Sequence, residues 1–555
     1  MGILLLPFQA RFLALTVCFT GSVILSLILA FHPESVWVVA APLAIAAGFT
    51  LLGLRDITQT SHSVLRNYPI LAHLRFLFET IRPEMRQYFF EADTDGAPFA
   101  RDKRAIVYQR AKRALDKRPF GTMQNVYADA YEWVHHSMAP KPLSTEPFRI
   151  MIGGPDCTAP YSASILNVSA MSYGALSANA IMALNKGARM GDFAHDTGEG
   201  SISPYHRKHG GDLIWELGSG YFGCRDREGR FSPETFAAVA ADPQIKMIEI
   251  KLSQGAKPGH GGVLPGAKVT AEIAAIRGVE EGRDCVSPAA HSAFSTPVEL
   301  LRFIAQLRSL SGGKPTGFKF CVGHPYEFFG LVKAMLETGI TPDFIVIDGT
   351  EGGTGAAPLE FMDHVGTPLR EGLSFVHSAL VGANLRAHIK LGCSGKIATA
   401  FDMARLLALG ADWCNAARSF MFALGCIQAQ QCHSGGCPTG VATQDPLRQR
   451  ALVVAEKARR VHNFHHETLK ALAELVSAAG LERPADLAPD HFMLRASQDQ
   501  VVTFARQYPC LVPGQLLTSA QDSKLPHHLA QAWAMARSDD FAPQILQRDH
   551  AGPSR

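Results

Sequence analysis

The sequence has little net charge, and this absence narrows the classes of partner it can have. Its 53 basic and 50 acidic residues leave a net charge of +3, and charged residues make up 19% of the chain. A nucleic-acid-binding surface needs a marked excess of basic residues, so the composition gives no reason to expect one. With 47% hydrophobic residues and a length of 555, the chain is typical of a globular protein with two or three structural units and some membrane-compatible surface.

The sequence also lacks the paired cysteines of a disulfide-bonded protein. Of its eleven cysteines, those outside one cluster of three stand singly in apolar runs, as Cys18, Cys321 and Cys414 do. This scatter is typical of reduced thiols in a cytosolic compartment.

A convincing dinucleotide-binding motif is absent as well. Residues 218–223, GSGYFG, match GxGxxG literally, but the polar, turn-like stretch CRDREGRFSPET follows where a helix should open. We therefore expect no nicotinamide domain, and any reducing electrons would have to come from a partner protein.

Three cysteines do stand close together. Cys426, Cys432 and Cys437 are separated by five and then four residues in the stretch GCIQAQQCHSGGCPTGVATQ. Such a compact loop suits an iron–sulfur cluster, and three ligands without a fourth cysteine nearby favour a three-iron form. A zinc site with His433 as the fourth ligand and a set of unligated thiols are the alternatives.

Two long apolar runs lie near the start of the sequence. Phe12–Phe31 carries no charge and would span about 30 Å as a helix, which is the thickness of a bilayer core. A second run, Val36–Leu54, follows after a short break. A cleaved signal peptide is the alternative for the first run, but two consecutive runs without a clear small-residue cleavage site favour a transmembrane hairpin over residues 1–58. Arg11 and Arg55 flank the hairpin and its loop carries no Lys or Arg, so we expect the inner (cytoplasmic) membrane, with the catalytic body facing the cytoplasm.

Residues 59–145 are rich in arginine, aromatic residues and helix formers. They are predicted to form a helical, membrane-proximal segment. We interpret its charges as a solvated helical face, although its position next to the membrane also allows contact with anionic headgroups.

Short apolar runs alternate with helical segments over roughly 250 residues, which is typical of a (β/α)₈ TIM-type barrel. A doubly wound α/β sheet would also alternate but usually has fewer strands. We expect the barrel within residues 146–450, with the cysteine loop at 426–437, and a helical extension over 451–555. The candidate strands are residues 165–172, 192–198, 246–252, 284–288, 315–322, 343–349, 388–395 and 412–418.

Glycine and polar residues follow these candidate strands. Active sites of such barrels lie at this carboxyl-terminal face, and phosphate groups commonly bind in the loops after the seventh and eighth strands. Gly395, Asn415, Ala416 and Ala417 are therefore candidate phosphate ligands through their backbone N–H groups.

Five motifs, in order along the chain, resemble the FMN-binding synthase domain of glutamate synthases. They read SAMSYGALS, DTGEG, KLSQGAKPGHGG, DGTEGGTGAAP and CIQAQQCHSGGCPTGVATQ. The resemblance covers about residues 146–450 and implies a (β/α)₈ barrel, FMN and a [3Fe–4S] cluster on Cys426, Cys432 and Cys437. It also implies reduction of 2-iminoglutarate, formed from 2-oxoglutarate and ammonia, to L-glutamate.

The resemblance assigns expected roles to individual residues. Lys319, at the end of the predicted fifth strand, would stabilise negative charge on reduced flavin. Lys251 and Gln254, at the end of the predicted third strand, would bind the substrate carboxylates, with Lys257 nearby. Glu199 would handle ammonia or position the imine, with a structural role as the alternative. The expected cofactor-binding residues are Ala170, Met171, Ser172, Lys319, Gly353, Gly395, Asn415, Ala416 and Ala417.

The sequence also departs from the family pattern. We expect no amidotransferase domain before the barrel and no glycine-repeat domain after it. His260 stands where family members tend to have Glu, and the cysteine loop carries Ser434-Gly435-Gly436 in place of bulkier polar residues. These differences leave the nitrogen donor and the amine product open. Ferredoxin or a separate reductase subunit would supply electrons, and an oligomer is compatible with the sequence.

Three other functions compete with glutamate synthesis. The first is formation of an N-alkylglutamate, such as N-methylglutamate from methylamine. The second is a membrane-tethered barrel that binds FMN but has lost turnover, against which the intact Lys251, Gln254 and Lys319 argue. The third is an FMN-dependent 2-hydroxy-acid oxidase, which would need a histidine base beside the flavin and gives no reason for three clustered cysteines.

Overall fold

The computed structural model describes residues 9–60, 62–518 and 524–544. The chain divides into two compact units, Met1–Gly96 and Ala97–Arg555. The boundary between the units falls inside the segment 59–145.

The first unit is helical. Its two longest helices, α1 (Leu13–Phe31) and α2 (Val36–Thr58), pack against each other, and the hydroxyl groups of Ser22 and Thr50 lie 3.2 Å apart between them. The spans Leu13–Phe31 and Pro33–Thr58 have mean hydropathies of 2.3 and 2.0 and are long and apolar enough to cross a membrane. The remaining elements are the 3₁₀ turn η2 (Pro33–Ser35), α3 (Ser63–Asn67), α4 (Leu71–Met85) and the π-helical turn η3 (Arg86–Phe90).

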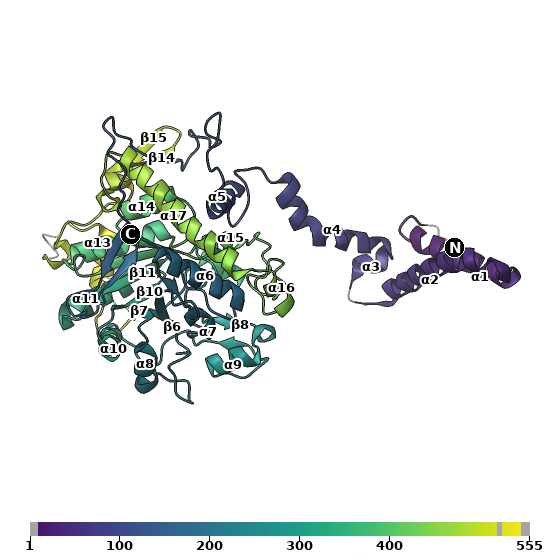
Figure 1. Cartoon of the computed structure of the whole chain (residues 1–555), viewed down its shortest axis with the longest axis horizontal. Coiled ribbons are helices and arrows are strands. Elements are labelled where there is room, and N and C mark those ends of the chain that lie inside the picture. The colour runs from purple at the N-terminus through teal and green to yellow at the C-terminus, as the bar shows by residue number, and fades with distance from the viewer. Residues whose placement is uncertain (1–8, 61, 519–523, 545–555) are drawn as a thin grey trace, which may run out of the picture. The chain divides into compact units, whose positions relative to one another are not determined.

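The second unit is built around a closed barrel of eight parallel strands, which confirms the predicted fold class (Figure 1). Around the barrel the strand order is β10-β11-β12-β13-β4-β5-β6-β7, so each barrel strand pairs with the next barrel strand along the chain and the last, β13, closes against the first, β4. The strands are β4 (Leu166–Val168), β5 (His195–Asp196), β6 (Leu213–Leu217), β7 (Ile245–Lys251), β10 (Thr316–Phe320), β11 (Phe344–Asp348), β12 (Lys390–Ser394) and β13 (Trp413–Ala416).

One predicted barrel strand is wrong and one was missed. Residues 284–288 contribute only β9 (Cys285–Val286), which pairs antiparallel with β8 (Val263–Leu264) outside the barrel. The third barrel strand is instead β6, whose Glu216 interrupts the apolar run that the prediction looked for. As a result Lys251 ends the fourth barrel strand and Gln254 follows it, whereas Lys319 lies on the fifth, as predicted.

Side chains on the barrel strands alternate between the helical layer and the interior. On β6, Trp215 stacks on Phe236 of helix α8 (Pro233–Ala240) with ring centroids 5.1 Å apart, while the next residue, Glu216, points into the barrel. The outward-facing side chains make the layer between strands and helices aromatic, and the inward-facing side chains make the interior of the barrel charged.

Helices surround the barrel, and several begin at side-chain caps. Thr296 and Glu299 form a capping box at α10, and Thr399 and Asp402 form one at α14. The helices of the second unit are α5 (Arg101–Lys112), α6 (Ala178–Gly191), α7 (Pro204–Arg207), α8 (Pro233–Ala240), α9 (Ala271–Arg277), α10 (Pro297–Leu310), α11 (Pro325–Thr338), α12 (Leu359–His364), α13 (Leu369–Gly382), α14 (Ala400–Ala408), α15 (Arg418–Leu424), α16 (Pro446–Arg450), α17 (Val454–Ala478), α18 (Phe504–Gln507) and α19 (His527–Met535).

The segments on either side of the barrel pack onto it together. The long helix α17 lies against α6, α5 and α14 (Figure 1). The extension after residue 450 is not purely helical, because β14 (Phe492–Ser497) joins β15 (Gln500–Thr503) and β1 (Glu132–Val134) in an antiparallel sheet. A further hairpin, β2 (Arg149–Ile152) and β3 (Tyr161–Ser164), precedes the barrel.

Candidate active site

A cleft of about 210 Å³ opens at the carboxyl ends of the barrel strands. It brings together residues that lie far apart in the sequence. The predicted residues that line it are Ala170, Met171, Ser172, Glu199, Lys251, Gln254, Lys257, Lys319, Gly353, Gly395, Asn415, Ala416, Ala417 and Cys432. Cys426 and Cys437, in the same loop as Cys432, are not among the residues that line the cleft.

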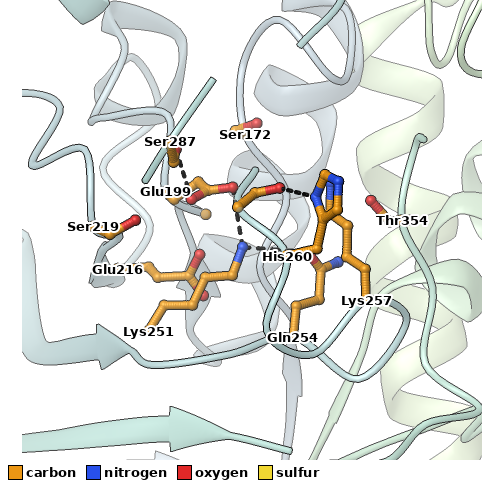
Figure 2. A network of polar contacts seen from close by, with 12 residues as sticks. Ser172, Glu199, Glu216, Ser219, Lys251, Gln254, Lys257, His260, Ser287 and Thr354 are labelled. Carbon is orange, nitrogen blue, oxygen red and sulfur yellow. Dashed lines mark hydrogen bonds and ion pairs between the residues drawn. The ribbon is translucent and has the colours of Figure 1, made fainter. Parts of the chain in front are cut away.

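A polar network centred on Lys251 forms one side of the cleft (Figure 2). Its Nζ donates to Glu199 Oε1 at 3.0 Å and to Gln254 Oε1 at 3.2 Å. Ser287 Oγ donates to the other Glu199 oxygen at 3.3 Å. Burial alone would raise the pKa of Glu199, but Lys251, with Arg277 and Lys257 behind it, lowers the pKa to about 2. Glu199 is therefore a fixed anion among cations rather than a proton carrier.

The backbone of the neighbouring loops holds the other polar groups of this network. Gln254 Nε2 donates to the carbonyl of Gly353 at 2.8 Å, and Lys257 Nζ donates to the carbonyl of Ala356 at 3.0 Å. Burial, and then the nearby Lys251, lower the pKa of Lys257 to about 8. His260 is the residue that departs from the family pattern. Its Nδ1 lies 2.8 Å from the carbonyl oxygen of Gly261.

Lys319 lies deeper, among three carboxylates that the sequence analysis did not connect with it. Its Nζ forms ion pairs with Glu216, with Glu249 at 3.0 Å and with Asp196 at 3.9 Å. Burial would lower the pKa of Lys319, but the three carboxylates outweigh burial and raise it. For the carboxyl groups, burial acts in the opposite direction. It raises the pKa of Asp196, and it raises the pKa of Glu249 to about 7.

The same three carboxylates could be mistaken for a metal site. Within the described residues they are the one group of three or more potential ligands whose ligand atoms all lie within 4.8 Å of one another. The Lys319 ammonium already provides the compensating positive charge. The cluster is therefore a buried ion-pair network at the floor of the cleft.

Glycines hold open the wall where the cofactor residues were predicted. A Cβ built on Gly353 would come within 2.1 Å of three atoms of the Arg418 guanidinium, so a larger residue would displace that side chain. Gly395 has φ +155°, and a Cβ there would press on Leu369 and Glu351. Ser394 Oγ donates to Asp348 Oδ1 at 2.5 Å and fixes the end of β12 just before this glycine.

Two side chains from other parts of the chain hold the cysteine loop, and a third contact lies within the loop itself. Tyr108 donates to the carbonyl of Cys426 at 2.5 Å, and Lys268 Nζ donates to the carbonyl of Cys432 at 3.3 Å. Cys437 Sγ lies 3.4 Å from Thr439 Oγ1. Burial raises the pKa of Cys426 to about 12, whereas hydrogen bonds from Thr439 and nearby backbone groups outweigh burial and lower the pKa of Cys437.

The thiols of this loop do not form a compact ligand set. Among the residues that the structure describes, no cysteine or histidine of the loop belongs to a group of three or more potential ligands whose atoms all lie within 4.8 Å of one another.

Sequence reasoning missed several cations and their partners. Arg277 is buried, and its Nη2 donates to the carbonyl of Tyr173 at 3.1 Å and to Ser172 Oγ at 3.4 Å. It lies at the end of α9, where local sequence gives no signal. Arg418 directly follows the predicted phosphate residues and could have been found there. The missed residues that line the cleft include Lys268, Arg277, Ser287, Asp348 and Arg418.

Comparison with known proteins shows the family of this chain. The family model "Conserved region in glutamate synthase" matches residues 156–482, more than half of the chain. The chain belongs to the glutamate synthase family. This membership makes it a glutamate-synthase-like oxidoreductase, as the sequence predicted.

Two relatives show how far the likeness extends. The glutamate synthase large subunit-like protein YerD of Bacillus subtilis is 37% identical, over 86% of this chain and 98% of its own length. The archaeal glutamate synthase [NADPH] of Methanocaldococcus jannaschii is 36% identical over 59% of this chain, but this chain covers only 61% of that enzyme. Among solved structures, the recombinant flavin-binding domain of baker's yeast flavocytochrome b2 aligns with a TM-score of 0.38 at 13% identity, over 70% of this chain and 78% of that one.

Proposed function

We propose that the chain reductively aminates 2-oxoglutarate, through 2-iminoglutarate, to L-glutamate. The observation that carries this proposal is the grouping of Lys251, Lys257 and Arg277 around Glu199 in one cleft at the strand ends. Two carboxylates of a 2-oxo diacid need several cations, and an iminium carbon needs a nearby anion. The cleft offers both. Membership in the glutamate synthase family supports the same chemistry.

In this proposal, the chain's own residues bind and orient the substrate. Lys251, Lys257 and Arg277 bind the carboxylates, and Gln254 adds a directed hydrogen bond. Glu199 stays ionised because its pKa is lowered to about 2, so it stabilises the protonated imine by charge and does not remove its proton.

FMN is the cofactor that the cleft residues fit. Gly353 and Gly395 leave room that a Cβ would fill, and Arg418 provides a cation beside them. Ala170, Met171 and Ser172 would lie along the ring system, and Asn415, Ala416 and Ala417 would bind the phosphate, as at other barrels of this class. When bound, FMN supplies the hydride. Lys319, which lines the cleft, would stabilise negative charge on the reduced flavin while remaining paired to its carboxylates.

A [3Fe–4S] cluster is proposed for Cys426, Cys432 and Cys437. Three thiols in one anchored loop match one ligand for each iron. Lys268 and Arg418 lie close enough to influence the thiols electrostatically, which suits a cluster that carries negative charge. When bound, the cluster relays electrons to the cleft from ferredoxin or a separate reductase. The names of several relatives specify NADPH, and a reductase that uses NADPH is compatible with this route.

The spans Leu13–Phe31 and Pro33–Thr58 are proposed to anchor the chain in the cytoplasmic membrane. Arg11 and Arg55 lie at the two ends of the hairpin and support a cytoplasmic location for both.

The deciding experiment is anaerobic reoxidation of the reduced full-length protein, purified in detergent. We expect flavin absorbance, the electron paramagnetic resonance signal of an oxidised three-iron cluster, and reoxidation by 2-oxoglutarate with ammonia. Faster reoxidation with methylamine would assign the N-alkylglutamate activity instead. A protein that binds flavin but is reoxidised by no amine would be the tethered barrel without turnover, and a colourless, iron-free protein would refute the proposal.

A further inference from the structure

Helix α4 of the first unit presents an apolar face that its own unit leaves exposed. At about 100° per residue, the side chains of this face fall within an arc about 120° wide. They are between 38% and 63% exposed. The residues are Leu71, Leu74, Leu77, Phe78, Ile81 and Met85.

The other side of α4 already has partners within the first unit. His73 Nε2 lies 3.0 Å from both carboxylate oxygens of Asp56, and the backbone N–H of Ile70 donates to the same carboxylate at 2.9 Å. The ring of Phe76 packs at 5.9 Å from that of His62. Ala72 is buried. These contacts fix the rotation of α4 about its axis, with the apolar arc turned away from α2.

Arginines line one edge of the apolar arc. Their side chains lie roughly 20° to 60° beyond that edge on the helical projection. The residues are Arg75, Arg82 and Arg86. Arg75 pairs with Glu79 at 2.9 Å, and Glu84 lies by the opposite edge. Beyond α4, the turn η3 exposes three aromatic side chains by 55% to 75%. These are Tyr88, Phe89 and Phe90.

The position of Asp56 indicates what covers the arc. Asp56 lies two residues before the end of α2, next to Arg55, where the uncharged apolar run Val36–Leu54 has just ended. Because His73 is held to Asp56, the first turns of α4 lie at the level where a hairpin in a bilayer reaches the headgroups. An amphipathic helix with an arginine edge and terminal aromatic residues is the pattern of a helix that lies in a membrane interface.

We propose that α4 lies in the interface of the bilayer that α1 and α2 cross, with its apolar arc in the acyl boundary and Arg75, Arg82 and Arg86 against anionic phospholipid headgroups. The proposal rests on insertion of the hairpin and is independent of the reaction in the barrel. It assigns the exposed apolar face to lipid, rather than to a second protein.

Photo-crosslinking of the full-length protein in vesicles tests this directly. A p-benzoylphenylalanine is placed at Phe78, in the arc, or at Thr80, on the opposite side of the same helix. A third position, Ile24 in α1, reports whether the hairpin is inserted. In vesicles of phosphatidylcholine and phosphatidylglycerol, we expect lipid adducts at Phe78 and Ile24 and several-fold less at Thr80.

The arginine edge has its own test. Exchange of phosphatidylglycerol for phosphatidylcholine should reduce the adduct at Phe78, by up to about fivefold for each arginine that contributes. Arg82→Gln should lose part of this preference, and Arg82→Lys should keep it, because the effect needs the charge alone.

The outcomes separate the two levels of the proposal. Three results would overturn the interfacial assignment while leaving the hairpin intact. They are lipid adducts at Ile24 with none at Phe78, equal lipid adducts at Phe78 and Thr80, and an adduct of Phe78 with protein. An absence of lipid at all three positions would overturn insertion itself and the interfacial assignment with it.

Discussion

Lys319 Nζ lies 3.0 Å from Glu249 Oε1 inside the barrel, on the neighbouring strands β10 and β7. Two more carboxylates, Glu216 and Asp196, compete for the same ammonium. The charge at the floor of the cleft therefore depends on one lysine and on how many of the three carboxyl groups are protonated.

Removal of this lysine should destabilise the fold. Lys319→Met leaves three buried carboxylates without a counter-charge, which we expect to lower the free energy of unfolding by about 3–5 kcal/mol, measured by denaturant unfolding. Arg537→Gln is the control, because its partner Asp539 is on the surface, and it should leave the free energy of unfolding nearly unchanged. A stability of Lys319→Met equal to that of the control would contradict the ion-pair network.

The same network should make stability depend on pH. Burial raises the pKa of Glu249 from 4.5 to about 7 in the folded protein. As the pH rises, Glu249 therefore loses its proton in the unfolded state before it does so in the folded state. The stability that Glu249 contributes is complete below about pH 4.5 and is lost as the pH rises through about 7. Glu249→Gln cannot lose this proton, so its stability relative to wild type should increase from pH 5 to pH 8 in paired unfolding curves. A pH-independent difference would argue against the raised pKa.

Substrate affinity should depend on Lys251. Lys251→Met removes a carboxylate ligand and leaves Glu199 without its nearest cation. We expect KM for 2-oxoglutarate to rise by at least about thirtyfold, equivalent to about 2 kcal/mol. Lys246→Met, at the other end of the same strand, removes a cation that pairs with Asp212 and should leave KM unchanged. Equal changes in KM for the two variants would mean that Lys251 does not bind the substrate.

Binding of FMN should depend on Gly353 but not on Gly355 of the same loop. Gly353→Ala puts a methyl group onto the Arg418 guanidinium, whereas a Cβ on Gly355 of the same loop meets nothing within 4 Å. Gly353→Ala should weaken FMN binding by about tenfold or more, which is about 1.4 kcal/mol, and Gly355→Ala should be neutral. Fluorescence of released flavin after gel filtration measures both. Similar loss from the two variants would point to a general effect on the loop.

Iron content should follow the cysteine loop alone. Cys426→Ala removes one proposed ligand, so anaerobically purified protein should lose its iron and acid-labile sulfide. Cys510→Ala removes an exposed cysteine of the C-terminal region and should keep both. Zinc in the wild-type protein, or equal iron in both variants, would rule out the cluster.

The sequence by itself determined the parts that local patterns encode. Alternating apolar runs and helices led to the barrel, polar residues after the runs marked the strand ends, and the cysteine spacing marked one loop. Two uninterrupted apolar runs sufficed for two long helices. In each case the signal lies within one continuous stretch of the chain, because it depends on residues that are near neighbours in the sequence.

Only the tertiary structure decided how distant charges combine. Glu216 made β6 look unlike a strand, because a charge is tolerated in the barrel interior only when Lys319, over a hundred residues away, compensates it. Arg277 likewise reaches the cleft from the end of a helix that sequence patterns leave unmarked. Barrel closure brings β5, β6, β7 and β10 side by side, and with them the partners of Lys319. Pairings of this kind follow from closure of the barrel, and no local pattern carries them.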